Sequence, residues 1–322
     1  ISIISPLYGG TFIDCTFGQG GYSKEILKNS SNKVIALDRD HNVSSIAKKL
    51  EIKTNGRLSF HNKKFSEVNK FENKVDDLKA VIFDLGYSIN QILDNKKGLS
   101  FQSEGKLDMR LGLNDFSCDE VISSISEKNL LKIFKYFGED KNSKIIAKRI
   151  IQRREKIKLQ TQDIVKIIGE VKKYKFSKIN PSTQIFQALR IYINKEITEL
   201  IYGLINSFQI LPIGGIIAVV SFHSIEDKIV KFFFKNYSDK KNNSRYLPDS
   251  KKIKCLKLNK TKPIYPSLNE IKLNPASRSA KLRFAIKTQE NKNFNEIFNK
   301  FKYLIDVENL NFKKWKNFYY FY

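Results

Sequence analysis

The chain has 322 residues, of which 41% are hydrophobic, and this length suits two domains or one domain with an insertion. No stretch approaches the roughly 20 apolar residues of a membrane-spanning helix, and no signal peptide is evident. We therefore expect a cytoplasmic protein without a membrane partner. Its three well-separated cysteines and three histidines fit neither a disulfide framework nor a zinc site, so we expect no metal.

The formal net charge is +25, and a polyanionic partner is the simplest use of such an excess. Lys, Asn and Ile are abundant throughout, as they are in proteins from AT-rich genomes, so part of the excess reflects composition. Charge alone favours contact with nucleic acid. The first residue is Ile rather than Met, so we expect the natural start to be absent from the sequence.

Residues 10–40 have the pattern of a strand, a glycine-rich turn, a helix and a second strand. The first apolar run ends at Asp14 and the second at Asp38, with Gly20 and Gly21 in the turn between them. Glycines let a backbone approach a ligand closely, and the start of the helix offers free N–H groups to an anion. Asp38 stands where a carboxylate accepts ribose hydroxyls. The pattern predicts a nucleoside-binding unit rather than a plain strand–helix connection.

The turn matches S-adenosylmethionine better than NAD. A dinucleotide turn needs glycine at its sixth position, which is occupied here by Ser23. Asp14, at the strand end, is suited to an ammonium group, which a pyrophosphate ligand lacks. S-adenosylmethionine carries an ammonium group, a carboxylate and a ribose, so its charges fit both acids.

Apolar runs predict a parallel sheet that is interrupted by helices. The predicted parallel strands are Thr11–Cys15, Lys33–Asp38, Arg57–His61, Lys79–Leu85 and Gly215–Phe222. Between about Asn114 and Leu211 the period is helical instead, for example over Glu127–Phe137, Ser143–Glu155 and Thr161–Lys172. Pro181-Ser-Thr183 predicts the start of a long helix with Gln187 and Arg190 on one face. The pattern indicates a doubly wound α/β sheet with an inserted helical domain.

The remainder of the chain carries weaker signals. Lys281–Lys287 alternates like a late antiparallel edge strand, and Asp239–Lys262 is polar and basic, as in a surface loop. The tail Asn291–Tyr322 carries aromatic residues among lysines, which would suit stacking on RNA bases. We favour the alternative that this tail is an amphipathic helix packing on its own domain.

Ionisable residues gather where the predicted strands end. Asp84 ends the fourth strand, and the sequence from Asp84 to Tyr87 is loosely similar to an acid–aromatic motif of amino-methylating enzymes. Asp108 and Arg110 follow a glycine-containing loop, and His223 follows the fifth strand. Each also has a plain structural explanation, as a turn cap or a packed histidine. We expect the strand-end residues to share one edge of the sheet.

Taken together, these segments resemble the bacterial small-subunit rRNA cytosine-N4 methyltransferase family (RsmH/MraW), and the GYSKEIL variant is most similar to alphaproteobacterial members. The resemblance covers about Gly10 to Lys287. It rests on the stretches GTFIDCTFGQGGYS, ALDRD, DLGYS, GLSF, LDMRL, the segment from Tyr136 to Ile150, PSTQIFQALRIYINKEI, GGIIAVVSFHSIEDKIVK and NPASRSAKLR.

The resemblance implies a Rossmann-like methyltransferase sheet at 1–111 and 196–287, an inserted substrate-recognition domain at 112–195 and a C-terminal extension at 288–322. It also implies S-adenosylmethionine as cofactor and a cytidine in the decoding region of 16S rRNA, within the small ribosomal subunit, as substrate. The positions that match the family's cofactor-binding residues are Gly20, Gly21, Tyr22, Asp38, Phe65, Asp84 and Gln91. The family usually has His at the position of Tyr22.

A mechanism follows as a hypothesis. The N4 amine of cytosine is a poor nucleophile, because its lone pair is delocalised into the ring, and an acceptor for its proton would help transfer. Asp84 is the first candidate acceptor, with Asp108 and His223 as alternatives, whereas Arg110 and Arg190 are suited to positioning phosphate or base. The cytosine must be unstacked, so a basic helical insertion would hold the surrounding RNA.

Three other functions remain open from the sequence. A DNA cytosine-N4 methyltransferase would share the chemistry, an NAD(P)-dependent reductase would share the βαβ unit, and a non-catalytic ribosome-assembly factor would share the charge. The sequence decides neither between naked rRNA and the assembled subunit nor the oligomeric state.

Overall fold

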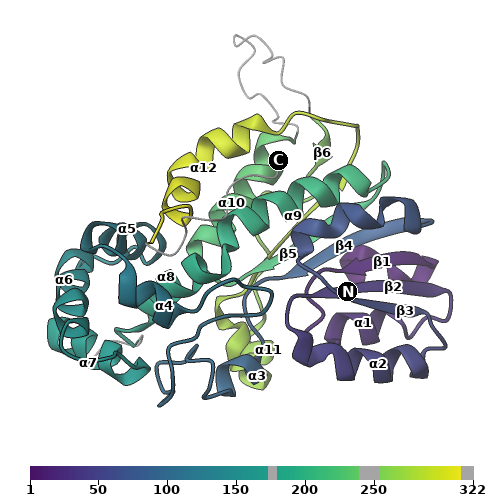
Figure 1. Ribbon diagram of the computed structural model, residues 1–322. Helices are drawn as coiled ribbons and strands as arrows, with labels where there is room; N and C mark the ends of the chain where they lie inside the picture. Colours follow the sequence, from purple (N-terminus) through teal and green to yellow (C-terminus); the bar gives the residue numbers. More distant parts are fainter. Residues whose placement is uncertain (173–179, 239–253, 313–322) are drawn as a thin grey trace, which may run out of the picture. The chain divides into compact units, whose positions relative to one another are not determined.

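The computed structural model describes residues 1–172, 180–238 and 254–312, which form two compact units (Figure 1). The first, which we call the sheet unit, comprises Ile1–Gly86 and Glu199–Lys300. The second, the helical unit, comprises Tyr87–Thr198 and the chain from Phe301 onward. Two of the boundaries fall inside helices, α9 (Glu196–Ile210) and α12 (Asn295–Glu308). The predicted functional division at residues 111, 195 and 287 stays a prediction.

The sheet has seven strands in the order β3-β2-β1-β4-β5-β7-β6. The neighbouring pairs among β1 to β5 are parallel, whereas β7 is antiparallel to both β5 and β6. The strand order reverses between β1 and β4, which is where ligands bind in open α/β sheets. The strands are β1 (Gly10–Asp14), β2 (Asn32–Asp38), β3 (Leu58–Asn62), β4 (Leu78–Asp84), β5 (Ile216–Ser221), β6 (Leu256–Lys257) and β7 (Lys281–Lys287).

The five predicted parallel strands are confirmed to within one residue at each end. Lys281–Lys287 is also a strand, but the prediction that it lies at the edge is wrong, because β6 pairs along its outer side. Strand β6 lies within the segment Asp239–Lys262, which was predicted to be a loop, and so corrects that prediction. Residues 239–253 of this segment lie outside the described residues. Two residues are too few to show a period, and the buried side chain of Leu256 fixes β6 through tertiary packing.

One face of the sheet is covered by α1 (Gly21–Ile26) and α2 (Ser44–Lys53). Because side chains alternate along a strand, Phe12, Ala80 and Ile82 all face this layer and are buried there with the apolar side of each helix. Short 3-10 turns complete this part of the chain. They are η1 (Ser2–Ile4), η2 (Pro6–Tyr8), η3 (His41–Val43) and η4 (Phe65–Lys74).

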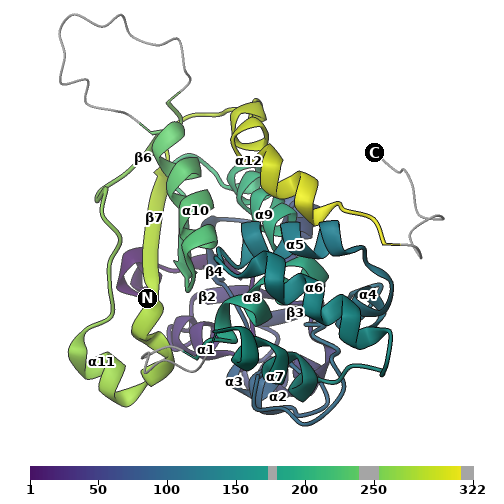
Figure 2. The same cartoon turned by 90° about the vertical axis from the view of Figure 1, so that its left-hand side faces the viewer.

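In the sheet unit, α9, α10 (Ser224–Asn236) and the start of α12 lie close together (Figure 2), and aromatic side chains join them. Phe294 stacks on Phe233 with 5.7 Å between ring centroids and meets Phe208 edge-on at 5.3 Å. The amphipathic helix predicted in the tail is present over Asn295–Glu308, and residues 313–322 lie outside the described residues. The unit also contains α11 (Leu268–Leu273) and η5 (Pro275–Ser279).

The helical unit is built from short helices around an apolar core. The predicted helices Glu127–Phe137 and Thr161–Lys172 are confirmed with the same bounds, and the one beginning at Ser143 ends one residue early. The helices are α3 (Ile89–Leu93), α4 (Cys118–Ser124), α5 (Glu127–Phe137), α6 (Ser143–Arg154), α7 (Thr161–Lys172) and α8 (Thr183–Asn194), with the first part of α9 and the last part of α12. Since α4 to α8 lie between β4 and β5 in the sequence, the expected α/β sheet with a helical insertion is confirmed.

The end of α12 is fixed to the helical unit by a buried carboxylate. Glu308 is 0% exposed. One of its oxygens accepts the N–H of Ile197 at 2.8 Å, and the other accepts the N–H and the hydroxyl of Thr198 at 3.0 and 2.6 Å. These N–H groups open α9 and would otherwise lack partners. The hydroxyl of Tyr192 also donates to the carbonyl of Leu310, so the C-terminal segment is part of the fold of this unit.

Among the described residues, every helix is either too short or too polar to cross a membrane.

Replacing Glu308 with Ala should lower the free energy of unfolding by about 2 kcal/mol, because buried donors lose their acceptor. Urea denaturation would measure the change. The matched control is Asp306→Ala, which removes an exposed acid from the same helix and should cost less than about 0.5 kcal/mol. Equal losses in the two variants would contradict this role for Glu308.

Candidate functional site

The turn after β1 requires glycine at one position and leaves space at the next. Gly20 has φ +73°, and a Cβ there would lie 3.0 Å from the ring of Phe17. A Cβ on Gly21 would meet no atom within 4 Å. The turn is therefore closely packed against Phe17 at Gly20 and open at Gly21, as expected for a turn that binds a ligand against its backbone.

Asp14 ends β1, and its carboxylate holds the turn together. Its side chain is fully buried, with one oxygen accepting the N–H of Thr16 at 3.2 Å and the other the hydroxyl of Ser23 at 2.7 Å. Burial raises the pKa of Asp14 to about 6, against the effect of these hydrogen bonds. The predicted contact with an ammonium group stays a prediction, since the structure shows both oxygens used within the turn.

Asp38 ends β2 and accepts two backbone hydrogen bonds. Its oxygens receive the N–H of Gly18 and the N–H of Asp40, each at 2.8 Å. Burial raises the pKa of Asp38, although these hydrogen bonds oppose the shift. A carboxylate has about four acceptor sites, so this side chain retains capacity for further hydroxyl donors.

Asp84 ends β4 and has an unsatisfied oxygen. Its N–H donates to the hydroxyl of Thr16 at 2.7 Å, but its buried Oδ1 has no hydrogen-bond partner among the described residues. Burial, followed by the negative charges of Asp14 and Glu226, raises the pKa of Asp84 to about 7. A buried acceptor without a donor is costly, so this oxygen is suited to accept a hydrogen bond from an external donor.

Tyr22 is the second residue of α1 and lines a cavity of about 240 Å³. Ile82 and Val220 form part of its wall, and Ile82 precedes Asp84 by two residues, so the cavity lies on the face of β4 toward which Asp84 points. Burial, then the charge of Asp84, raises the pKa of Tyr22 well above its usual range, which keeps the phenol protonated. The sheet unit therefore has a cavity beside Tyr22, on the same face of β4 as Asp84.

Two other predicted residues of the sheet unit have structural partners. Phe65 packs edge-on against Phe83 with 5.3 Å between ring centroids. His223 caps α10 in a capping box, in which the carboxylate of Glu226 accepts the N–H groups of Phe222 and His223 at 2.9 and 3.3 Å. Their roles toward a ligand stay predictions.

The remaining predicted residues lie in the helical unit. The side chain of Gln91 caps α3 by accepting the N–H of Ser88 at 3.0 Å, and its amide donates to the carbonyl of Leu111 at 3.3 Å. Arg110 forms two hydrogen bonds of 2.8 Å to Asp108. Burial opposes the shift, but these bonds lower the pKa of Asp108, which makes it a weaker proton acceptor than Asp84.

Arg190 is held on two sides within the helical unit. Its guanidinium donates two hydrogen bonds to Glu196, at 2.8 and 2.9 Å, and lies over the ring of Tyr87 at 4.6 Å from its centroid. The paired carboxylate neutralises the arginine, while the aromatic contact fixes its plane.

The structure thus brings Tyr22 and Asp84 together around Asp14, with Gly20, Gly21 and Asp38 in the neighbouring turns of the same unit. Gln91, Asp108, Arg110 and Arg190 belong to the other unit. The sequence pattern indicated Glu226 only as an acid in the first turn of a helix after the fifth strand, and it did not single out Glu196. Glu226 lies three residues after His223, which is the spacing of a capping box, so the sequence contained a signal for it. The pairing of Glu196 with Arg190 is visible only in the fold.

Comparison with known proteins gives a match along most of the chain. The profile of the MraW methylase family matches residues 1–288. The chain is 38% identical over 299 residues to "Ribosomal RNA small subunit methyltransferase H" of Orientia tsutsugamushi (strain Ikeda), covering 90% of this chain and 96% of the relative. A relative of the same name from Bartonella bacilliformis is 40% identical over 295 residues, which cover 89% of this chain and 86% of the relative.

This chain belongs to the MraW methylase family.

Solved structures are more distant. A rRNA methylase from Streptococcus thermophilus is 10% identical, with a TM-score of 0.35 over 87% of this chain and 88% of that one. The family assignment therefore rests on the sequence matches. Its relatives include alphaproteobacterial proteins, as the GYSKEIL variant predicted. The match to the MraW family ends before α12, so the Glu308 contact lies in a segment outside the matched region.

Asp84→Asn should stabilise this MraW family member, and by more at pH 8 than at pH 5. The folded-state pKa of about 7 lies above the usual value of 3.8, so the folded state binds the extra proton. Stability contributed by Asp84 is therefore lost as pH rises through this interval, by at most about 1.4 kcal/mol per pH unit. The neutral amide avoids this loss.

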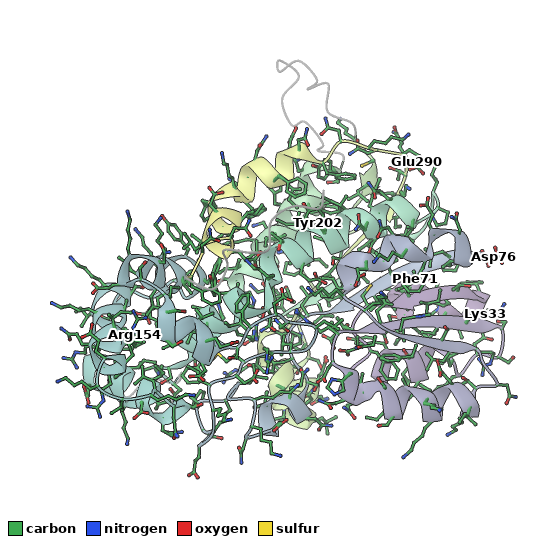
Figure 3. All side chains as sticks on the ribbon, viewed as in Figure 1. Lys33, Phe71, Asp76, Arg154, Tyr202 and Glu290 are labelled. Carbon is green, nitrogen blue, oxygen red and sulfur yellow. The ribbon has the colours of Figure 1, made fainter. Side chains whose placement is uncertain are left out.

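Urea denaturation at the two pH values would measure the difference. The control is Asp76→Asn at the exposed rim of the sheet unit (Figure 3). This variant should change the free energy of unfolding by the same small amount at both pH values. A change in Asp84→Asn that is independent of pH would contradict the raised pKa.

Proposed function

We propose that this MraW family member transfers a methyl group from S-adenosylmethionine to the N4 amine of a cytidine in the decoding region of 16S rRNA. The observation that carries the proposal is the buried, unpartnered oxygen of Asp84 at the carboxyl end of β4. The names of the relatives, rRNA small subunit methyltransferases, support the substrate class.

The residues of the sheet unit fit the cofactor. Open space at Gly21 leaves room for a ligand against the backbone, and Asp38 retains acceptor capacity for ribose hydroxyls. Ser23, where a dinucleotide turn would have its last glycine, instead donates to Asp14, which disfavours NAD. When bound, S-adenosylmethionine would supply an electrophilic sulfonium methyl group.

Asp84 would act as the proton acceptor for the amine. A carboxylate that accepts a hydrogen bond from the amino group draws electron density toward the nitrogen and then takes the proton as the N–C bond forms. A pKa of about 7 is matched to this task, since the group is partly ionised at neutral pH and basic enough to accept a proton. Asp108 has a lowered pKa and His223 caps a helix, so both are weaker candidates.

The deciding experiment incubates the protein with labelled S-adenosylmethionine and small ribosomal subunits that lack the modification, with naked 16S rRNA and duplex DNA alongside. We expect label as N4-methylcytidine at one decoding-region position. Label on DNA alone would indicate the DNA methyltransferase, and tight RNA binding without label would indicate an assembly factor. Asp84→Asn should lose transfer, and wild-type kcat/KM should rise about tenfold per pH unit below pH 7, because only the ionised carboxyl accepts a proton.

Gly21→Ala should weaken cofactor binding without destabilising the fold. The added methyl meets no protein atom and replaces a helical glycine, so stability should be unchanged or higher. The affinity for S-adenosylmethionine, measured by calorimetry, should fall at least about tenfold, which corresponds to about 1.4 kcal/mol of binding free energy. Unchanged affinity would place the cofactor elsewhere.

A further inference from the structure

Residues 141–158, which contain α6, are the part of the helical unit where basic residues are most concentrated. They include one acidic residue, Glu155, whereas the whole chain has 33 acidic to 58 basic residues. The basic residues are Lys141, Lys144, Lys148, Arg149, Arg153, Arg154, Lys156 and Lys158. The local ratio of eight to one exceeds that of the whole chain.

The helical period gathers four of these cations on one exposed face. Ser143, Ile146, Ala147 and Ile150 are buried and define the opposite side of α6. Lys144 and Lys148 follow one exposed ridge, and Arg149 and Arg153 follow the next, with four residues or about 6 Å between the members of each pair. We call these four residues the α6 basic face.

Arg154 shows how α6 is anchored. Its guanidinium donates to the carbonyls of Ile122 and Ile125 at 2.7 and 2.6 Å, so its charge caps the end of α4 (Figure 3). This inward contact fixes the rotation of the helix and leaves the α6 basic face toward solvent.

Acidic partners are scarce on this face. Arg149 pairs with Glu170 at 3.0 Å, but Lys144, Lys148 and Arg153 have no carboxylate within 4.0 Å among the residues that the structure describes. Like charges four residues apart destabilise a helix by about 0.2–0.5 kcal/mol per pair. The fold therefore gains nothing from this arrangement, and a bound polyanion would relieve the repulsion.

We propose that the α6 basic face binds the phosphodiester backbone of the substrate RNA. This inference rests on the proposed function, which makes RNA the polyanion that the protein must hold. Two parallel rows of flexible, exposed cations match a string of phosphates, which are contacted as point charges without base-specific pockets. Gln152 and the half-exposed Ile145 continue these two rows and carry no charge.

The test compares two triple variants of equal charge. Lys144→Gln/Lys148→Gln/Arg153→Gln neutralises the face, and Lys48→Gln/Lys49→Gln/Lys53→Gln neutralises three exposed cations of α2 in the sheet unit. Both lower the net charge from +25 by three, and glutamine is a good helix former. Any difference between them therefore reports where the charge lies rather than how much remains.

Binding to small subunits and to naked 16S rRNA is measured across salt concentrations without cofactor. The α6 variant should lose about tenfold in affinity, and the slope of log K against log salt should fall by about 2, since each phosphate contact contributes about 0.7–0.9. The α2 variant should retain the wild-type slope. Equal slopes in the two variants would overturn the proposal, and so would a loss confined to assembled subunits, which would indicate a protein partner.

Methyl transfer is then measured separately. The α6 variant should raise KM for the RNA substrate about tenfold while kcat and S-adenosylmethionine affinity stay at wild-type values. If wild-type protein binds RNA through α6 but transfers no methyl group, the proposed function fails and the RNA-binding face stands. If transfer proceeds and the two variants have the same KM, the proposed function stands and the RNA-binding face fails.

Discussion

Two carboxylates are buried near one another where the strand order of the sheet reverses. Asp14 and Asp84 end neighbouring parallel strands; burial raises the pKa of both, and the charge of Asp14 raises that of Asp84 further. Two like charges out of water are unfavourable, and the local structure is arranged around this constraint. Ser23 and Thr16 donate to Asp14, the hydroxyl of Thr16 also accepts the N–H of Asp84, and the turn between them follows from these contacts.

The asymmetry between the two acids follows from their partners. Both oxygens of Asp14 are hydrogen-bonded inside the turn, whereas Oδ1 of Asp84 is left without a donor. One carboxylate therefore maintains the architecture, and the other is available for chemistry. Burial raises the pKa of Asp84, and its Oδ1 has no donor among the described residues, which supports the proposed role of Asp84 as proton acceptor.

Charge is used differently in the helical unit. Several basic residues there have internal partners, such as Arg110 with Asp108, Arg190 with Glu196 and Arg154 with backbone carbonyls. These pairs shape loops and helix ends. The cations of the α6 basic face have far fewer partners among the described residues, so the fold makes little use of their charge. The buried Glu308 shows the opposite case, a charge used entirely to close a helix end.

The sequence by itself determined the parallel strands, the helical insertion and the family, because these follow from local periodicity and from ordered motifs such as the turn at Gly20 and Gly21. It also placed Asp38 and Asp84 at strand ends, where their backbone positions are fixed by the pattern. The sequence could therefore name candidate site residues, which stay predictions, but it could not name the side chains that they contact.

Only the tertiary structure decided which side chains meet. It showed that Asp14 is used inside the turn, that Glu226 adds its charge near Asp84, that β6 covers the outer side of β7 and that Glu308 caps α9 from more than 100 residues away. Burial and pairing depend on contacts between distant segments. These contacts determine the pKa of a group and whether a buried oxygen has a hydrogen-bond donor. Local periodicity contains no information about them, because it records only which face of an element is apolar.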